Sequence, residues 1–325
     1  MKKYYISWWN LENLFDVQES SERPEWLQKE LEKELEGWSQ EILDRKINKL
    51  ASIIKKMNHE DGPDVIGVCE VENRRVLTML RDRIDISGRQ YRIAHHETSD
   101  KRGIDVAFIY DSSIVTAGDQ FFYVVLKRTA TRDLFQVNFN TRSGRPLILI
   151  GNHWPSRRGG VLHSEPYRII AAETLSYWLT RIIEIKGEDV GVVILGDFND
   201  EPANRSITDY ALATNSPAKV LNSRIPRLLN MMWPFYGKSL GTHYFQNFPN
   251  ILDQVMVVKG ILNARSGFCI SGYSDGCPEV AIEMMEEMIS GGKYPEPVRF
   301  GRPASSMNKD GYSDHYPVSM VLKES

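Results

Sequence analysis

Residues 192–200 have the sequence Val-Val-Ile-Leu-Gly-Asp-Phe-Asn-Asp, a short apolar run that ends in a group of polar residues. The apolar part, residues 192–195, is typical of a buried strand. Asp197 and Asn199 come directly after it and are therefore predicted at the carboxyl end of that strand. Taken alone, a carboxylate in this position is more often a turn former or a helix N-cap than a catalytic group. The pattern gains weight because it recurs along the chain.

Five other strand-like runs also carry polar residues at one end. Asn10, Glu70 and the pair Asn152–His153 follow such runs, whereas Asp253 and the pair Asp314–His315 precede them. If the last two strands are antiparallel to the other four, all six polar ends meet on one rim. A wholly parallel sheet would exclude this arrangement.

Such a rim would bring several carboxylates close together. The carboxylates concerned are those of Glu70, Asp197, Asp253 and Asp314. Like charges at short distance repel unless a cation or a proton lies between them. Oxygen ligands without a cluster of Cys or several His residues favour Mg²⁺, with Mn²⁺ or Ca²⁺ as alternatives, over structural zinc. Glu70 is the preferred ligand, because Mg²⁺ usually takes only one or two carboxylates and keeps positions for water and phosphate.

Composition excludes several classes of protein but does not indicate a function. The chain has 325 residues, of which 42% are hydrophobic and 26% charged, so collagen-like, mucin-like and wholly disordered proteins are excluded. The 40 basic and 43 acidic residues give a net charge of −3, so no overall positive field indicates a nucleic acid or membrane partner. No transmembrane segment and no partner protein are predicted. We expect a soluble protein, either cytoplasmic or a mature secreted form lacking its signal.

The cysteines favour a reduced compartment. Cys69, Cys269 and Cys277 form no metal-type pair, although a bridge between the last two across a short loop remains open.

The periodicity predicts helices packed over sheets. After Ser39, apolar residues recur at helical spacing up to residues 61–63, and a second amphipathic helix is predicted over about 166–185. The short strands between them are partly antiparallel, with a hairpin turn at 141–145, so the class is mixed α/β. The charged residues 19–37 predict a surface helix or an ordered excursion. Residues 266–308, rich in Gly, Pro and Ser, predict an elaborated loop or helical insertion.

Seven motifs, in this order, resemble those of the endonuclease/exonuclease/phosphatase superfamily, which has the DNase I-like fold. They are Ser7–Asp16 (SWWNLENLFD), Asp64–Glu70 (DVIGVCE), Gly103–Ala107 (GIDVA), Gly151–Trp154 (GNHW), Leu195–Asn199 (LGDFN), Leu252–Val255 (LDQV) and Ser313–Pro317 (SDHYP). The resemblance implies a four-layer α-β-β-α sandwich of two mixed sheets. It also implies one domain over residues 1–325, with insertions near 19–37 and 266–308.

The resemblance implies a divalent-metal-dependent hydrolase of phosphate esters. Asn10 and Glu70 match the metal-site Asn and Glu of the family, and Asp314 matches the acidic residue of its closing Asp-His pair, which we group with the metal site. Asp197 and Asn199 match the pair that activates and orients the attacking water. General base catalysis of this kind contributes roughly 10²- to 10⁴-fold to a rate.

The same resemblance assigns roles to two histidines. Asp253 matches the acid that partners His315, and a neighbouring carboxylate would keep this histidine cationic so that it donates to the phosphate. His153 matches the second histidine of the DNase I and phosphatase branches, where it would stabilise the transition state or donate to the leaving group. Positioning and charge stabilisation are the main demands of phosphoryl transfer.

The substrate is less well defined than the chemistry. Asn152, Arg157 and Arg158 lie beside His153 in the sequence and are candidate substrate-binding residues, since Arg pairs suit phosphate. A solvated surface turn is the alternative for each arginine. The aromatic residues Tyr244, Phe245 and Phe248 would stack a base or pack their loop, and packing is favoured.

Three functions are left open by these observations. The first is nuclease-like hydrolysis of phosphodiesters, for which nucleic acid is a possible substrate but not a required one. The second is a phosphatase or phospholipase-type activity on phosphoinositides or sphingomyelin, with the aromatic residues 233–236 as the candidate membrane-contacting loop. The third is a catalytically silent binding protein, against which the intact set of polar residues argues.

Overall fold

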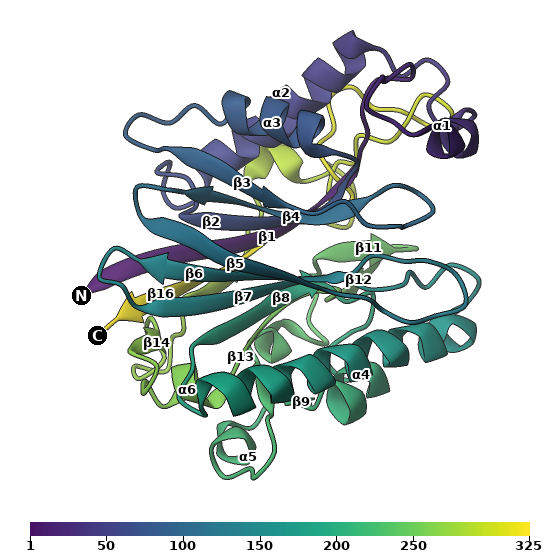
Figure 1. The fold of residues 1–325 in the computed structure, drawn as a ribbon. Helices are drawn as coiled ribbons and strands as arrows, with labels where there is room; N and C mark the ends of the chain where they lie inside the picture. Colours follow the sequence, from purple (N-terminus) through teal and green to yellow (C-terminus); the bar gives the residue numbers. More distant parts are fainter.

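The structure is a computed structural model that describes all residues from 1 to 325, and its main strands form two mixed sheets packed face to face (Figure 1). The first sheet has the strand order β14-β16-β1-β2-β4-β3, with β15 also paired to β16. Its strands are β1 (Lys2–Leu14), β2 (Val65–Val71), β3 (Tyr91–His95), β4 (Asp105–Asp111), β14 (Phe268–Ile270), β15 (Val280–Ile282) and β16 (Val318–Glu324).

The second sheet has the strand order β5-β6-β7-β8-β13-β10-β9. Its strands are β5 (Val115–Tyr123), β6 (Leu134–Thr141), β7 (Pro146–His153), β8 (Val192–Asp197), β9 (Ala213–Thr214), β10 (Leu228–Asn230) and β13 (Asp253–Val257). A separate hairpin is formed by β11 (His243–Phe245) and β12 (Phe248–Asn250).

Helices cover the outer faces of both sheets, which gives four layers (Figure 1). The helices α2 (Gln40–Lys56) and α3 (Arg74–Arg83) cover the first sheet, and α4 (Val161–Lys186) lies along the second. The predicted α/β four-layer sandwich is therefore confirmed. The short helical elements are α1 (Glu25–Leu31), α5 (Pro217–Leu221), α6 (Lys259–Leu262), η1 (Ser206–Tyr210), η2 (Trp233–Phe235) and η3 (Glu286–Met288).

Side chains that alternate along the strands form three apolar cores, one between the two sheets and one between each sheet and its helices. Trp8 packs in the core between the sheets, whereas the adjacent Trp9 packs beneath α2 and α3. In the second sheet, Leu149 faces the space between the sheets and Ile150 faces α4. Successive side chains of a strand point to opposite faces, and because both faces are buried here the strands are almost continuously apolar.

The strand directions bring the predicted polar ends to one end of the sandwich. β16 is antiparallel to β1, and β13 is antiparallel to β8, whereas β1–β2 and β7–β8 are parallel pairs. The predicted reversal of the last two strands is therefore confirmed. The polar ends meet at the end of the sandwich away from both chain termini (Figure 1).

Two segments differ in detail from the sequence prediction. Residues 19–37 combine the two predicted alternatives, because they form an ordered excursion that contains one short helix, α1. A buried ion pair fixes this excursion beside β2, with Arg23 Nε donating to Glu72 Oε1 at 2.6 Å. Residues 266–308 contain the short strands β14 and β15, which extend the first sheet through β16, rather than only loop or helix.

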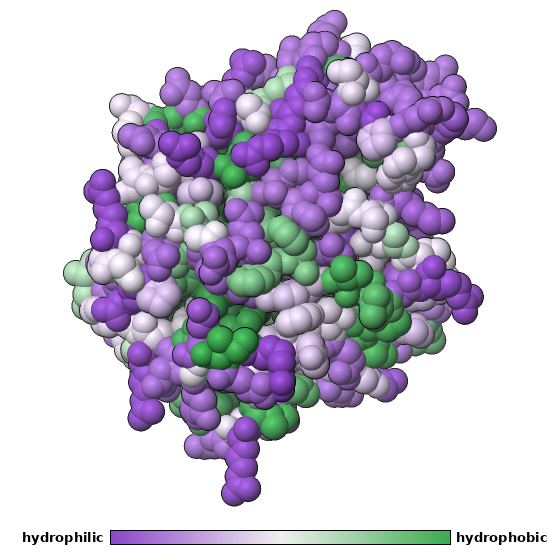
Figure 2. All heavy atoms as spheres, viewed as in Figure 1, coloured by the Kyte–Doolittle hydropathy of each residue, from purple (hydrophilic) through white to green (hydrophobic).

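The remaining predictions for helices and cysteines largely hold. The helix α2 begins directly after Ser39, which caps it, but α4 begins at Val161, before the predicted start near residue 166, and contains Pro166. All three cysteines are free. None of the helices combines the length and apolarity that a membrane span requires. On the face drawn in Figure 2, apolar side chains form separate small patches in a mostly hydrophilic surface.

Trp8→Ala is expected to lower the free energy of unfolding by about 3–5 kcal/mol. The indole is fully buried between the sheets, and a Cβ at Gly67, its neighbour on β2, would lie 2.6 Å from Trp8 Cε3, so the ring is closely packed on that side. Urea unfolding of both proteins measures the difference. Tyr177→Ala on the exposed side of α4 is the control and should change stability by less than about 0.5 kcal/mol. Equal stability of the two variants would contradict this account of the core.

Candidate catalytic site

Four candidate site residues are placed by the alternation of the strands. Asn10 has the same parity as Trp8, which faces the space between the sheets. His153, Asp197 and Asp253 have the parity of inward-facing residues on β7, β8 and β13. The cores of these strands are apolar, so the polar residues occur where the strands leave the core. The site therefore lies between the two sheets, at their common rim.

Asp197 is buried and held by three hydrogen bonds. Asn10 Nδ2 donates to Asp197 Oδ2 at 3.1 Å, and the Asn199 backbone N–H donates to Oδ1 at 2.9 Å. Asn199 Nδ2 also donates to Oδ2, at 3.2 Å. Burial raises the pKa of Asp197 to about 7, with His315 lowering it and the Asp253 charge raising it further. Asp197 can therefore both release and accept a proton near neutral pH.

Glu70 reaches the site through an irregularity in β2. Its backbone is left-handed, with φ 60°, and the pairing register of β2 shifts between Cys69 and Val71. The Asn13 backbone N–H donates to Glu70 Oε2 at 2.9 Å, while Oε1 lies 3.6 Å from Arg102 Nη1 and 3.7 Å from His153 Nε2. Burial opposes ionisation, but Arg102 and His315 hold the pKa of Glu70 below its usual value. Glu70 is thus a carboxylate with one oxygen not engaged in a short hydrogen bond.

His315 and Asp253 form a short polar contact within the site. His315 Nδ1 lies 2.7 Å from Asp253 Oδ2, and the hydroxyl of Thr242 accepts from the Asp253 backbone N–H at 3.0 Å. Burial disfavours the imidazolium, but the charge and hydrogen bond of Asp253 raise the pKa of His315 well above its ordinary value. His315 is therefore a cation with Nε2 directed away from its partner. Asp253 Oδ1 is buried without a hydrogen-bond partner.

His153 has the opposite charge state from His315. It is buried, and its Nε2 lies 3.8 Å from Asp197 Oδ2. Burial, together with the nearby cations Arg132 and Arg102, moves the pKa of His153 well below its ordinary value. Its Nδ1 has no partner. His153 and His315 are therefore a neutral and a cationic imidazole within one site.

Asp314 lies beside this pair. Its carboxylate is half-buried, and ligand atoms of Asp314, His315 and His243 lie within 4.8 Å of one another.

Three of the predicted site residues lie outside this cluster. Asn152 is buried on the α4 side of β7, where its amide donates to Ile150 O and accepts from Trp154 Nε1. Arg157 donates to Asn199 O at 2.7 Å and also to Asp200, Asn204 and Asn250, so its guanidinium braces the loops around the site. Arg158 is exposed. Consecutive residues of a strand point to opposite faces, so Asn152 must point toward α4 if the next residue, His153, points inward.

Three other residues near the site were not predicted there. Arg102 donates to Asn13 Oδ1 and lies beside Glu70. Arg132 is buried and donates to Trp154 O at 2.8 Å. The ring of His243 lies 4.7 Å from that of His315, and its Nδ1 is buried without a partner. Burial lowers the pKa of His243 to about 3. No sequence signal distinguishes these residues, because each comes from a loop or short strand positioned by tertiary contacts.

Arg157→Ala is expected to lower stability by about 1–3 kcal/mol, because it removes a charged donor from several buried acceptors. The Asn199 loop would lose its brace, so kcat should fall as well. Arg158→Ala is the matched variant and should leave the unfolding midpoint unchanged, because its side chain is exposed. Thermal unfolding and steady-state kinetics of the two variants test this. An unchanged midpoint for Arg157→Ala would argue that Arg157 binds substrate instead.

A family model described as the endonuclease/exonuclease/phosphatase family matches residues 5–324, which is almost the whole chain and includes every residue of the site. The chain belongs to this family. Members of the endonuclease/exonuclease/phosphatase family are phosphoesterases and generally depend on a divalent metal. No curated protein sequence matches the chain.

Solved structures of the family have the same fold at low sequence identity. An endonuclease/exonuclease/phosphatase family protein from Bacteroides thetaiotaomicron is 14% identical, with a TM-score of 0.58, over 99% of this chain and 98% of that chain. The mannosyl-6-phosphatase Bt3783 of Bacteroides thetaiotaomicron has 14% identity and a TM-score of 0.57, over 98% and 99% of the two chains. TDP2 of D. rerio, complexed with a single-strand DNA product, has 13% identity and a TM-score of 0.54, over 99% and 100%.

The residues present fit the divalent metal on which the family generally depends. The donor set at the rim consists of carboxylate and amide oxygens, which suit Mg²⁺ or Mn²⁺. Glu70 Oε1 makes no short hydrogen bond and faces the interior of the cluster. Asn10 Oδ1 accepts from the Glu12 backbone N–H at 2.9 Å, which fixes its amide and leaves a second lone pair.

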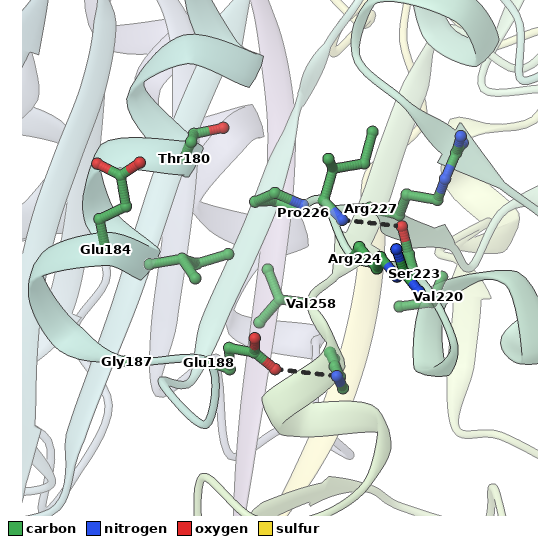
Figure 3. A pocket seen from close by; sticks show the side chains of 13 residues that line it. Thr180, Glu184, Gly187, Glu188, Val220, Ser223, Arg224, Pro226, Arg227 and Val258 are labelled. Carbon is green, nitrogen blue, oxygen red and sulfur yellow. Dashed lines mark hydrogen bonds and ion pairs between the residues drawn. The ribbon is translucent and has the colours of Figure 1, made fainter.

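A surface hollow elsewhere on the molecule is separate from this family site. It lies between the end of α4 and residues 223–227 (Figure 3), and Lys259 Nζ in it donates to Glu188. The start of α4 follows His153 closely in the chain, whereas the hollow is at the other end of this helix. Its 26 residues span about 39 Å. The hollow contains none of the candidate catalytic residues.

Proposed function

We propose that this protein is a divalent-metal-dependent hydrolase of phosphodiester bonds, with a nuclease-like substrate as the first choice. The proposal rests on two histidines of different charge state that lie beside carboxylates at one buried rim. A neutral His153 lies between the carboxylates of Glu70 and Asp197, and a cationic His315 is paired with Asp253. This combination supplies a base, a proton donor and a cation within one cluster.

Asp197 is the proposed base for the attacking water. Its hydrogen bonds from Asn10 and Asn199 fix the orientation of the carboxylate, so a water on the open side would be aligned without further reorganisation. Asn199 has φ 49°, a left-handed conformation that turns the chain sharply after β8 and presents its side chain to Asp197. The proton of the water would move to Asp197.

The two histidines are proposed to stabilise the phosphate in different ways. His315, held as a cation by Asp253, donates from Nε2 to a non-bridging oxygen and offsets the negative charge. His153 is neutral and donates a hydrogen bond without adding charge. Its buried Nδ1 has no partner in the protein, so the tautomer is not fixed by a neighbour.

The metal would be held by Glu70, with Asn10 and Asp314 as further ligands. When bound, a divalent cation supplies Lewis acidity to a phosphoryl oxygen and positive charge that favours the ionised form of nearby carboxylates. Arg102, beside Glu70, adds a fixed cation on the same side of the site.

Phosphomonoesters are the second candidate substrate. The fold is shared with a protein named mannosyl-6-phosphatase and with TDP2 bound to a DNA product, so likeness of fold supports both classes equally. A lipid substrate has less support. Trp233 and Phe235 are half-buried, and Phe235 packs against the core between the sheets, so Tyr236 is the single exposed aromatic residue that the candidate membrane-contacting loop offers.

A substrate screen tests the proposal. Purified protein is incubated with Mg²⁺ or Mn²⁺ and with single-stranded and duplex DNA, RNA, abasic DNA, a sugar phosphate, phosphoinositides and sphingomyelin. We expect hydrolysis of a phosphodiester that chelation abolishes. Hydrolysis of none of these substrates, or hydrolysis that is insensitive to chelation, would overturn the proposal.

Glu70→Gln is expected to weaken Mn²⁺ binding by at least roughly 10- to 100-fold, the loss seen for weaker outer-shell partners. The substitution keeps the shape of the side chain and the acceptor for Asn13, so the fold should be retained. Calorimetric titration of metal-free protein measures this without any substrate. Glu173→Gln on α4 is the control and should not alter the affinity. Unchanged binding in Glu70→Gln would place the metal elsewhere.

A further inference from the structure

The hairpin β11–β12 is connected directly to the catalytic cluster. His243, at the start of β11, forms a β-bridge with His315, and the two rings are 4.7 Å apart. The strands pair His243 with Asn250, Tyr244 with Pro249 and Phe245 with Phe248. Two left-handed residues, Gln246 and Asn247, form the turn. Two central residues with positive φ are typical of a type I′ turn, whose twist matches that of the two strands of a hairpin.

Two phenylalanines at the tip of this hairpin are exposed. Phe245 is 65% and Phe248 is 72% exposed, so the prediction that these aromatics pack their loop is wrong. Tyr244 behaves as predicted, since it is half-buried and packs against the first sheet. Burial of a phenylalanine side chain away from water is favourable. A ligand that covers the exposed rings of Phe245 and Phe248 would therefore gain binding free energy.

The register of the hairpin places both phenylalanines on the face that carries His243. Residues directly opposite in an antiparallel pair share a face, and residues two apart on a strand share it as well. Phe245, Phe248, His243 and Asn250 therefore lie on one face, and Tyr244 and Pro249 on the other. Asn250 also accepts from Arg157, which braces Asn199. The phenylalanines thus continue a surface that begins at the catalytic histidine.

We propose that Phe245 and Phe248 form a stacking platform for an unpaired nucleobase next to the scissile phosphate. This inference rests on the proposed phosphodiesterase function and names its substrate as a nucleotide chain with an unstacked base. The faces of phenylalanine rings bind the faces of bases without regard to sequence. A base inside a duplex has both faces covered by its neighbours, so the platform selects single-stranded or flipped nucleotides.

The turn residues favour a base over a lipid surface as the occupant. Gln246 and Asn247 are exposed at the tip, between the two phenylalanines. Insertion of this tip into a membrane would remove two amide side chains and the turn backbone from water without partners, which is costly. A base that lies flat on the rings leaves these groups in water.

The test compares wild-type protein with Phe245→Ala, Phe248→Ala and the double variant. The substrates are a single-stranded oligodeoxynucleotide, the same strand in a duplex, and a strand of equal length built of abasic sites. We expect each substitution to lower kcat/KM for the single strand by roughly 5- to 150-fold, the range that loss of one stacked base gives. Hydrolysis of the abasic strand should not change. Tyr177→Ala, an exposed aromatic on α4, is the matched control and should leave all rates unchanged.

The outcomes separate this inference from the proposed function. Hydrolysis by wild-type protein with equal rates in the double variant would overturn the platform and leave the function standing. Hydrolysis only of substrates that lack a base would do the same. If no substrate is hydrolysed, the proposed function fails, and calorimetry with adenosine monophosphate and ribose 5-phosphate still tests the platform. The platform is supported if wild-type protein binds the nucleotide more tightly than ribose 5-phosphate and the double variant loses this difference. Equal binding of the two ligands by wild-type protein, or a difference that the double variant retains, overturns it.

Discussion

Asp197→Asn is expected to lower kcat/KM for a phosphodiester by roughly 10²- to 10⁴-fold, the contribution of a positioned general base. The amide cannot accept the proton of the attacking water at neutral pH. It retains an acceptor oxygen for Asn10 or Asn199, so the loop after β8 should keep its conformation. Steady-state kinetics at saturating metal measure the loss. The reduction should appear in kcat more than in KM, because the base acts in the transition state.

The unfolding midpoint of Asp197→Asn shows whether a loss of activity comes from loss of the base or from loss of the folded structure. Burial raises the pKa of Asp197 to about 7, so in metal-free protein its ionisation opposes folding above the pKa of the unfolded chain. Removal of the ionisable group should therefore not lower the unfolding midpoint at pH 8 in the presence of a chelator. Asp209→Asn, at an exposed position of η1, is the control for both measurements. Activity of Asp197→Asn close to that of wild type would exclude Asp197 as the base.

The sequence predicts the architecture well because its strongest signals are periodic. Short continuous apolar runs define the central strands, and the polar residues at which these runs end mark the rim. Asn10, His153, Asp197 and Asp253 all continue the inward parity of their strands, so their positions follow from the period of two. The same rule, applied to Asn152, places it on the α4 side, where the structure has it.

The rest of the site depends on breaks in that period. Glu70 would point toward the helices if β2 were regular, and its left-handed backbone and the register shift redirect it. A bulge of one residue leaves no signature in a single sequence when the residue is not glycine. Arg102 and His243 are placed by loops whose geometry is set by distant contacts. The exposure of Phe245 and Phe248 is a property of the packed surface and not of the local sequence.

His315→Ala is expected to lower kcat by roughly 10²- to 10³-fold, the loss typical of one preorganised donor to a developing oxyanion. The imidazolium is the one cation of the cluster that is fixed by a short contact to a buried carboxylate, at 2.7 Å. The substitution also leaves Asp253 as a buried carboxylate with neither oxygen paired, since its Oδ1 already has no partner. Some loss of stability should therefore accompany the loss of activity, and His315→Gln, which can still donate, is the milder comparison.

Asp253→Asn distinguishes a positioning role from a direct one. If Asp253 acts only through His315, the double variant with His315→Ala should be no slower than His315→Ala alone, because the two substitutions remove one interaction. In Asp253→Asn alone, the pKa of His315 should fall, because the charge that raises it is removed. Nuclear magnetic resonance of the imidazole nitrogens reports that change directly. Additive losses with an unchanged imidazole would instead assign Asp253 a separate contact with the substrate, and the buried Oδ1 that has no partner is the atom that would make it.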